Sequence, residues 1–450
     1  MRSLAAALMA AFLSGCAIYH ARPLRASAQA ALKGPSQQAL VNDAHHLKVP
    51  GLRPIRLNFA APLTGQELGV IAVLANPDLK TLRSRARVAH AQVFAAGLLP
   101  DPVVQFSALR PYGVGSIGKT TALSDGFLWD LSRLVTRETD IKIAQQHAQA
   151  IDYGVAWHEW VVANQARLDA RRLYWLGLQW RMARRAETLY AHHGRLLTKD
   201  ARAGLVAGPR LLAWQTTLDA LRLQVASLHR AFIAARMSLN QALGLPPDAR
   251  LRLAPPGPLS LPHASAPALF HRARARRLDL VALVAAYHSA DYALLRTILD
   301  QYPRLSLGLA GARNSSGVSE AGLQLSLVVP LFNGNRGAIA IARAHRSALF
   351  AAYVARLARA RAQIYRLRAM TVSLDREARN LRGRAQALHG MAHASASSYK
   401  AHALGLFSYL TLTQELLTVR LRLLALKLSL ATTAIALQTA TAEPWSRGRS

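Results

Sequence analysis

The sequence has a single cysteine, few aromatic residues and few long apolar runs. One cysteine in 450 residues excludes a disulfide framework, a zinc site built on cysteines and a CxxC redox centre. Aromatic residues make up 6% of the chain although 52% is hydrophobic, so alanine and leucine supply the apolar bulk and favour long helices. Beyond the first residues, no stretch has the roughly 18 charge-free apolar residues that a membrane-spanning helix needs.

The N-terminus has the pattern of an export signal followed by a lipid attachment site. Arg2 precedes an apolar run from Leu4 to Leu13, as in a secretory signal peptide. The sequence Leu13-Ser14-Gly15-Cys16 then resembles the lipobox of bacterial lipoproteins, in which the thiol receives a diacylglyceryl group. The alternative is an ordinary secretory signal with an incidental cysteine. We expect a mature chain that begins at Cys16 and is held on the outer membrane by acyl chains.

Acidic residues are also scarce, with 23 Asp and Glu against 56 Lys and Arg and a net charge of +33. The basic residues are dispersed, no DNA- or RNA-binding motif is present and the leader exports the chain, so we expect no nucleic-acid partner. No nucleophile elbow, phosphate loop or pair of acids appears, which argues against an enzyme, a catalytic residue or a cofactor. The pairs His192-His193 and His389/His393 have helical spacing for a metal but no carboxylate or thiol beside them, and surface imidazoles are the favoured interpretation.

The chain is an internal duplication with an offset of 201 residues. Asn76-Pro77-Asp78-Leu79 aligns with Arg277-Leu278-Asp279-Leu280, Pro102 with Pro303, and Gly204-Leu205 with Gly405-Leu406. A proline-rich segment separates the two repeats. The predicted organisation is a signal peptide (1–15), an irregular lipidated arm (16–75), repeat 1 (76–245), a proline-rich linker (246–276), repeat 2 (277–442) and a polar tail (443–450).

Each repeat is predicted to run helix, two strands, long helix, helix. In repeat 2 a helix over 278–300 is followed by 305–311 and 322–329, where leucines alternate with small or polar residues as in membrane β-barrel strands. A soluble amphipathic hairpin is the alternative. The counterparts in repeat 1, near 102–110 and 122–131, alternate less cleanly.

Seven-residue spacing of apolar residues predicts helices that pack side by side in the later part of each repeat. The rows are Leu211, Leu218, Val225, Phe232 and Leu239; Leu367, Leu374, Leu381 and Leu388; and Leu421, Leu428 and Ile435. A helix over 335–395 would be about 90 Å long at ~1.5 Å per residue, too long for a compact domain. Four strands cannot close a membrane barrel alone, whereas three copies supply twelve, so the sequence predicts a trimer.

Several motifs together resemble the TolC-type outer-membrane efflux proteins, in the lipoprotein branch that serves resistance-nodulation-division pumps. The resemblance covers roughly residues 70–442. It rests on Asn76-Pro77-Asp78-Leu79, Ala95-Ala96-Gly97-Leu98-Leu99-Pro100-Asp101-Pro102, Val329-Pro330-Leu331-Phe332-Asn333-Gly334-Asn335-Arg336-Gly337, and the segments that begin at Gly204 and Gly405.

The resemblance implies a mainly α fold with a small β part: a trimeric 12-stranded outer-membrane β-barrel continued by a long periplasmic α-helical barrel. It implies a passive exit duct for small molecules or metal ions in a tripartite efflux system. The implied partners are two further copies, a periplasmic adaptor (membrane fusion protein), a resistance-nodulation-division-type inner-membrane transporter and outer-membrane lipid. A lipid-anchored coiled-coil scaffold without channel activity is the alternative, but it gives no reason for four alternating strands.

The resemblance also implies roles for three groups of residues. The strand–helix junction comprises Pro330, Asn333, Gly334 and Gly337, and the adaptor-contacting hairpin tips comprise Gly204, Leu205, Gly405 and Leu406. Pro330 ends strand pairing, and Gly334 and Gly337 are expected to let the backbone turn into the helix.

The third group is the periplasmic constriction, formed by Phe407, Leu410, Thr411 and Gln414. Many relatives have acidic residues where this chain has Thr411 and Gln414, and the nearest carboxylate here is Glu415. We therefore expect a constriction closed by packing of Phe407, Leu410 and Leu412, with weak cation selectivity or an anion preference.

Overall fold

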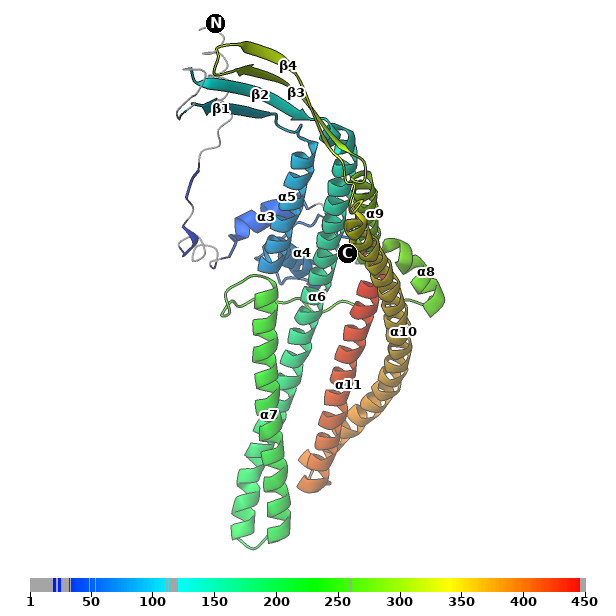
Figure 1. Cartoon of the computed structure of the whole chain (residues 1–450). Helices are drawn as coiled ribbons and strands as arrows, with labels where there is room; N and C mark the ends of the chain where they lie inside the picture. Colours follow the sequence, from blue (N-terminus) through cyan, green and yellow to red (C-terminus); the bar gives the residue numbers. More distant parts are fainter. Residues whose placement is uncertain are drawn as a thin grey trace.

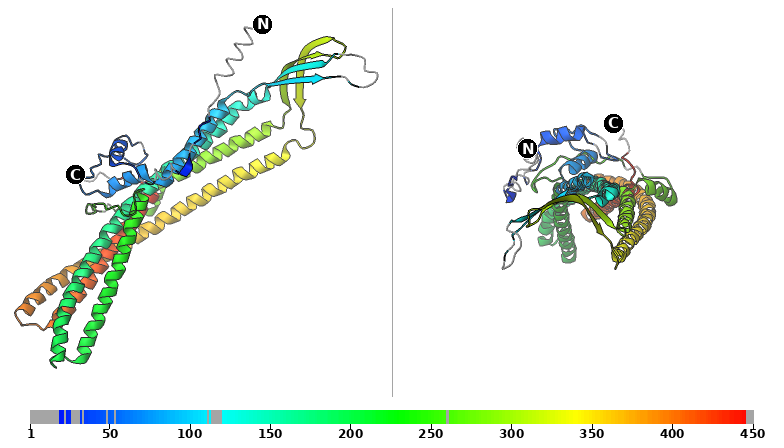
Figure 2. Two further views of the ribbon diagram at one scale, coloured as in Figure 1. Left: turned by 90° about the vertical axis from the view of Figure 1, so that its left-hand side faces the viewer. Right: turned by 45° about the horizontal axis from the view of Figure 1, so that its top comes forward.

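The structure is a computed structural model that describes residues 19–445 except 22, 26–31, 33, 48, 53, 111, 113–119 and 259–260. The predicted signal peptide, Cys16 and residues 446–450 of the predicted tail lie outside the described residues. The described chain is a long rod of helices with a curved sheet at one end (Figures 1 and 2).

Both repeats have the predicted order of elements. The first contains α5 (Pro77–Gly97), β1 (Val103–Leu109), β2 (Ala122–Asp130), α6 (Ser132–Arg202) and α7 (Gly208–Ala242). The second contains α9 (Leu278–Leu299), β3 (Arg304–Arg313), β4 (Ser319–Val328), α10 (Arg336–Lys400) and α11 (Leu406–Thr441). In each repeat the last two helices form an antiparallel hairpin that points away from the sheet (Figure 1). The predicted strands and long helices are therefore confirmed.

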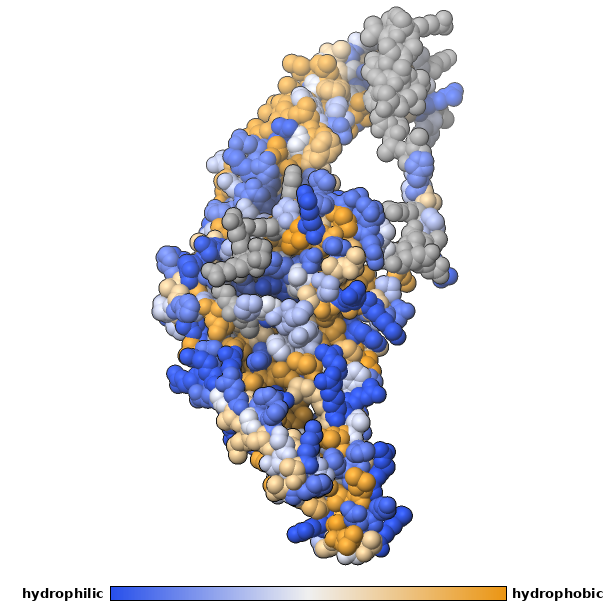
Figure 3. Space-filling view, turned by 180° about the vertical axis from the view of Figure 1, so that it is seen from behind, coloured by the Kyte–Doolittle hydropathy of each residue, from blue (hydrophilic) through white to orange (hydrophobic). Residues whose placement is uncertain are grey.

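The four strands form one antiparallel sheet in the order β1-β2-β3-β4. Its register places the alternating leucines of β3 and β4 on one face, because Leu307 lies opposite Leu325 and Leu309 opposite Leu323. Gly308 pairs with Gln324 on the other face. The leucine face is exposed in the single chain, with Leu323 81% and Leu325 66% accessible. Hydrophobic residues also gather at this end of the molecule in the space-filling view (Figure 3).

The heptad rows lie on the faces along which the helices of each hairpin pack. On α7, Leu218 and Leu239 are buried and Phe232 is half-buried against α6. On α10 the predicted row is buried at Leu367 and half-buried at its other three leucines, and the neighbouring row Ile364, Thr371, Ala378 and Ala385 is buried throughout. The small residues allow α11 to pack closely against this helix.

The arm, linker and tail are more ordered than the sequence indicated. The arm contains α3 (Gln37–His45) and α4 (Gly65–Ala75), and the linker contains α8 (Ala266–Arg276). Helix α4 is buried along most of its length and begins with a capping box between Thr64 and Glu67. The sequence did not predict this helix, because a helix that is apolar on every side has no helical period in its hydrophobic pattern.

Trp445, in the predicted polar tail, is also part of the core. Its ring packs against Gly69 of α4 and Trp160 of α6, and its Nε1 donates a 3.1 Å hydrogen bond to Oδ1 of Asn164. The prediction of a polar tail from residue 443 is therefore wrong at this residue.

Helices α9 and α11 are long and apolar enough to cross a membrane by length and composition alone. Neither helix is free of charge, because α9 contains Asp279 and Asp291 and α11 contains Glu415 and Arg420. The prediction that no charge-free run of that length is present therefore holds for both helices. Both helices pack against α6 and α10 within the rod. Their apolar character therefore serves packing between helices.

In each repeat, a polar side chain at the start of the first helix donates a hydrogen bond to the end of the last helix. Asn76 caps α5 and its Nδ2 donates a 3.0 Å hydrogen bond to the carbonyl of Ala242, at the end of α7. Arg277, its counterpart at the offset of 201, donates a 3.1 Å hydrogen bond from an Nη atom to the carbonyl of Ala440, near the end of α11. The same contact therefore ties the first helix to the last in both repeats.

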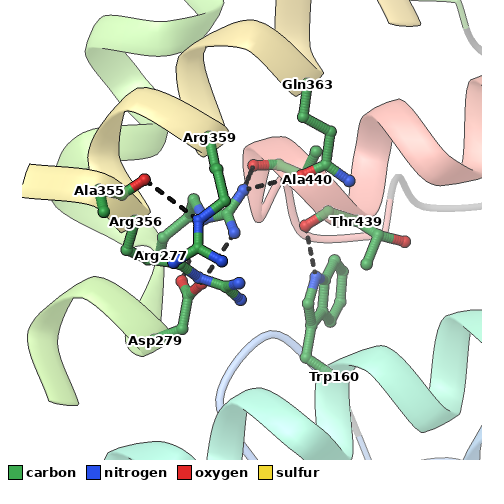
Figure 4. A network of polar contacts seen from close by, with 9 residues as sticks. All are labelled: Trp160, Arg277, Asp279, Ala355, Arg356, Arg359, Gln363, Thr439 and Ala440. Carbon is green, nitrogen blue, oxygen red and sulfur yellow. Dashed lines mark hydrogen bonds and ion pairs between the residues drawn. The ribbon is translucent and has the colours of Figure 1, made fainter. Parts of the chain in front are cut away.

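Arg277 is the centre of a buried charged network (Figure 4). It is 2% exposed, makes two hydrogen bonds of 2.7 and 3.0 Å to Asp279, and its guanidinium lies 4.7 Å from the Trp157 ring. Arg356 of α10 makes a further contact of 2.6 Å with Asp279. Burial acts to raise the pKa of Asp279, but the hydrogen bonds and charges of Arg277 and Arg356 outweigh it and leave that pKa below its usual range.

Replacement of Arg277 by alanine is expected to destabilise the fold by about 3–5 kcal/mol, because it leaves a buried carboxylate with one partner fewer. The matched control is Arg359→Ala on α10, since among the described residues that exposed arginine hydrogen-bonds only to Ala355 of its own helix. Thermal unfolding followed by circular dichroism measures both.

Because the folded pKa of Asp279 is lowered, its stabilisation is present above about pH 4 and is lost as the pH falls through the folded value. The stability that Asp279→Asn loses relative to the wild type is therefore expected to shrink at strongly acidic pH.

In the comparison of the two arginine variants, an equal loss of stability for Arg277→Ala and Arg359→Ala would contradict the importance of the network.

Candidate functional sites at the strand–helix junction and the hairpin tips

The junction after β4 turns the chain from the sheet into α10. The strand ends at Val328, and Pro330 follows it without a backbone N–H to donate. Gly334 has φ +50° and Asn335 has φ +56°, so two consecutive residues adopt left-handed conformations immediately before the helix begins at Arg336. Glycine and asparagine are the residues that tolerate this conformation best.

Two asparagines stabilise this turn. Oδ1 of Asn333 accepts a 2.8 Å hydrogen bond from the backbone N–H of Asn335. The side chain of Asn335 donates a 2.8 Å hydrogen bond to the carbonyl of Thr297 in α9. Gly337 lies in the first turn of α10, so Asn335 rather than Gly337 joins Gly334 in making the turn.

The first hairpin tip connects α6 and α7 through residues 203–207. Gly204 has φ +74°, and the N–H of Leu205 donates a 2.9 Å hydrogen bond to the carbonyl of Asp200, which closes the end of α6. Leu205 is 76% exposed at the end of the rod. The tip therefore presents an apolar side chain to the surroundings.

The second tip has a different turn. His402, with φ +59°, takes the left-handed conformation, whereas Gly405 is the extended N-cap residue of α11. Leu406 begins α11 and is half-buried. The two glycine–leucine pairs occupy corresponding tips but not the same backbone conformation.

The four residues predicted for the constriction have different surroundings within one chain. Leu410 is 3% exposed in a core shared by both hairpins, and the exposed Thr411 donates a 2.9 Å hydrogen bond to the carbonyl of Phe407. Phe407 is half-buried with Arg210 of α7 above its ring, 5.6 Å from the centroid. Gln414 is half-buried, and its Oε1 is buried without a partner in the described chain.

An aromatic cluster that sequence analysis missed joins the two hairpins near their tips. Tyr190 of α6 stacks on Trp214 of α7 at 4.6 Å, and its hydroxyl donates a 2.8 Å hydrogen bond to the carbonyl of Leu410 in α11. Tyr399 of α10 and Tyr409 of α11 stack at 5.0 Å. His193 of α6 meets both of these rings edge-on, at 6.1 and 6.4 Å.

The surroundings of Tyr190 and His193 favour their neutral forms. Burial, with a smaller contribution from Tyr409, raises the pKa of Tyr190 to about 12, so its hydroxyl remains a donor over the physiological range. Burial, followed by the neighbouring His192, lowers the pKa of His193. The signal in the sequence was the gathering of rings at corresponding ends of four helices in a chain with few aromatics.

Two pairs of charged or ionisable groups near the tips contact each other within the chain. Glu415 makes a 2.8 Å ion pair with Arg384 of α10, and Arg420 lies 2.7 Å from Nδ1 of His389. Within the described residues no group of three His, Cys, Asp or Glu side chains is placed to hold a metal ion.

Tyr190→Phe is expected to loosen the start of α11, because it leaves the Leu410 carbonyl without its side-chain donor. Tyr399→Phe is the matched control, since it also removes a hydroxyl from the cluster but keeps the ring stacking. Hydrogen exchange measured by mass spectrometry should speed up by about tenfold over residues 406–414 in Tyr190→Phe only. Equal rates in both variants would contradict the role of this hydrogen bond.

No protein-family model and no curated protein sequence matches the chain. Solved structures do match along nearly its whole length. The outer-membrane channel OprN has a TM-score of 0.71 with 18% identity, covering 90% of this chain and 96% of that one. The Campylobacter jejuni CmeC outer membrane channel has a TM-score of 0.71 with 13% identity, covering 97% and 95%.

The open state of the Neisseria gonorrhoeae MtrE outer membrane channel also has a TM-score of 0.71, with 16% identity over 90% of this chain and 96% of that one. These proteins share the sheet at one end and the helical rod, so the resemblance drawn from the sequence motifs is confirmed for the fold. The chain has the fold of the TolC-type outer-membrane efflux proteins.

Proposed function

We propose that three copies of this protein form the outer-membrane exit duct of a tripartite efflux system. The observation that carries this proposal is a four-stranded sheet with one apolar face and two unpaired edges, at the end of a chain that matches outer-membrane channels over 90% or more of its length. The duct conducts its cargo passively, and an inner-membrane transporter supplies energy and substrate choice.

The sheet supports the trimer on physical grounds. Strands β1 and β4 are its edges, and their outward N–H and C=O groups have no partner in the sheet of one chain. In lipid each unsatisfied backbone group costs several kcal/mol. Closure of twelve strands from three chains pairs all of these edges and directs the leucine face towards lipid.

The tips support contact with a periplasmic adaptor. They lie at the end of the rod opposite the sheet (Figure 1), and Leu205 is exposed there beside a turn. In the assembly we propose, Gly204, Leu205, Gly405 and Leu406 meet the adaptor, and the adaptor connects the duct to a resistance-nodulation-division-type transporter. We place the constriction near Phe407, Thr411 and Gln414, because Leu410 is buried in the core of its own chain. It is proposed to close by packing, since Glu415 is paired with Arg384 in its own chain.

Substitutions on adjacent residues of β4 test the membrane barrel. Leu325→Arg places a charge on the face that we assign to lipid and is expected to cost about 2–4 kcal/mol, whereas Gln324→Arg places it on the opposite face at little cost. Light scattering in detergent should show a trimer for the wild type and Gln324→Arg, and loss of the trimer for Leu325→Arg. A monomeric wild type, or no difference between the variants, would instead favour the lipid-anchored coiled-coil scaffold.

Anchoring to the outer membrane is proposed to occur through acyl chains on Cys16. The mature protein should incorporate labelled palmitate in cells, and Cys16→Ser should abolish the label because no other thiol is available. Ser14→Ala is the control, since it leaves the thiol in place. A mature N-terminus other than residue 16 in intact-mass spectrometry would contradict the anchor.

A further inference from the structure

A pocket of about 350 Å³ lies between α6, α7 and the extended segment that follows α7. Arg181 of α6, Arg236 of α7 and Arg250 of the following segment line it together. Phe232 and Leu251, both half-buried, contribute apolar walls. At Gly177 the wall has no room for a larger side chain, because a Cβ atom there would lie 3.1 Å from the Phe232 ring and 3.4 Å from an Arg181 nitrogen. It lies in the body of the rod, far along α6 and α7 from the hairpin tips.

The three guanidinium groups have no protein partner in the described chain. None of them makes a hydrogen bond, an ion pair or a contact with an aromatic face there. Other arginines of the same rod are paired with carboxylates, such as Arg83 with Glu159 and Arg277 with Asp279. Three positive charges around one small space repel one another, and no carboxylate in the pocket compensates them.

Arg236 provides an independent indication of a ligand. Its Nε–H is buried and has no hydrogen-bond partner within the described residues. A buried donor without a partner is costly, and such groups are rare in folded proteins. A carboxylate accepts hydrogen bonds from the Nε and Nη atoms of one arginine side by side, so an anion in the pocket would satisfy this atom.

We infer that this pocket binds a small organic carboxylate with an apolar body, one per chain. The guanidinium groups of Arg236, Arg181 and Arg250 hold the carboxylate, and Phe232 and Leu251 contact the apolar part. The site is independent of the proposed duct, because its ligand is held between two helices of one chain. A ligand bound in this pocket contacts α6, α7 and the segment after α7 at the same time.

The test is isothermal titration of the full-length protein in detergent with 2-naphthoate, against a detergent-only blank. We expect one site per chain, and Arg236→Gln should weaken the affinity by about tenfold or more. Arg230→Gln, which removes the same charge from an exposed position of α7 outside the pocket, should change it by less than about twofold. The uncharged 2-naphthylmethanol should bind at least about tenfold more weakly, because it cannot pair with the arginines.

A second readout separates ligand binding from a structural role. Without ligand, Arg236→Gln should not lower the thermal midpoint, because it removes a buried donor that has no partner together with one of three repelling charges. Absence of 2-naphthoate binding, equal loss of affinity in both variants, or equal binding of the alcohol would overturn the inference. A lower midpoint of Arg236→Gln with unchanged affinity would overturn it as well, since that result assigns the arginine a structural role.

Discussion

The structure depends on how one short sheet satisfies its backbone hydrogen bonds. Its two inner strands are paired on both sides, and β1 and β4 are paired on one side only. In water such edges are tolerated, but in hydrocarbon they are too costly to remain open. An exposed leucine face and unpaired edges on the same sheet are compatible if neighbouring chains continue the sheet. The arrangement therefore connects the fold with the membrane location and the assembly that we propose.

The helical rod has a second requirement, which is to hold long helices together with few polar anchors. The duplicated contacts of Asn76 and Arg277 fix the ends of each repeat near the middle of the rod, where α4 and Trp445 also pack. The aromatic cluster around Tyr190 fixes the two hairpins to each other near their tips. Between these regions Trp180 of α6 stacks on His229 and Phe232 of α7, which holds the first hairpin together along its length.

Much of this fold could be predicted from the sequence because its determinants are local and periodic. The helix predicted over 278–300 is Leu278–Leu299, and the strand predicted over 305–311 is Arg304–Arg313. Contacts between distant residues could not be predicted. The Tyr190–Leu410 hydrogen bond joins residues 220 positions apart, and Trp445 meets Asn164 across 281. Helix α4 has no periodic hydrophobic pattern that predicts it. The turn before α10 is made by Gly334 and Asn335, whereas the sequence predicted Gly334 and Gly337.

We propose that the assembled protein is a channel, and that its constriction closes by packing of side chains and not by pairs of carboxylates with basic groups. Current measured across planar bilayers with a salt gradient tests it most directly. The account predicts discrete conductance steps on insertion, and a reversal potential that shows weak cation selectivity or an anion preference at neutral pH. Strong cation selectivity would contradict the proposed constriction, and the absence of steps from the assembled protein would contradict the duct itself.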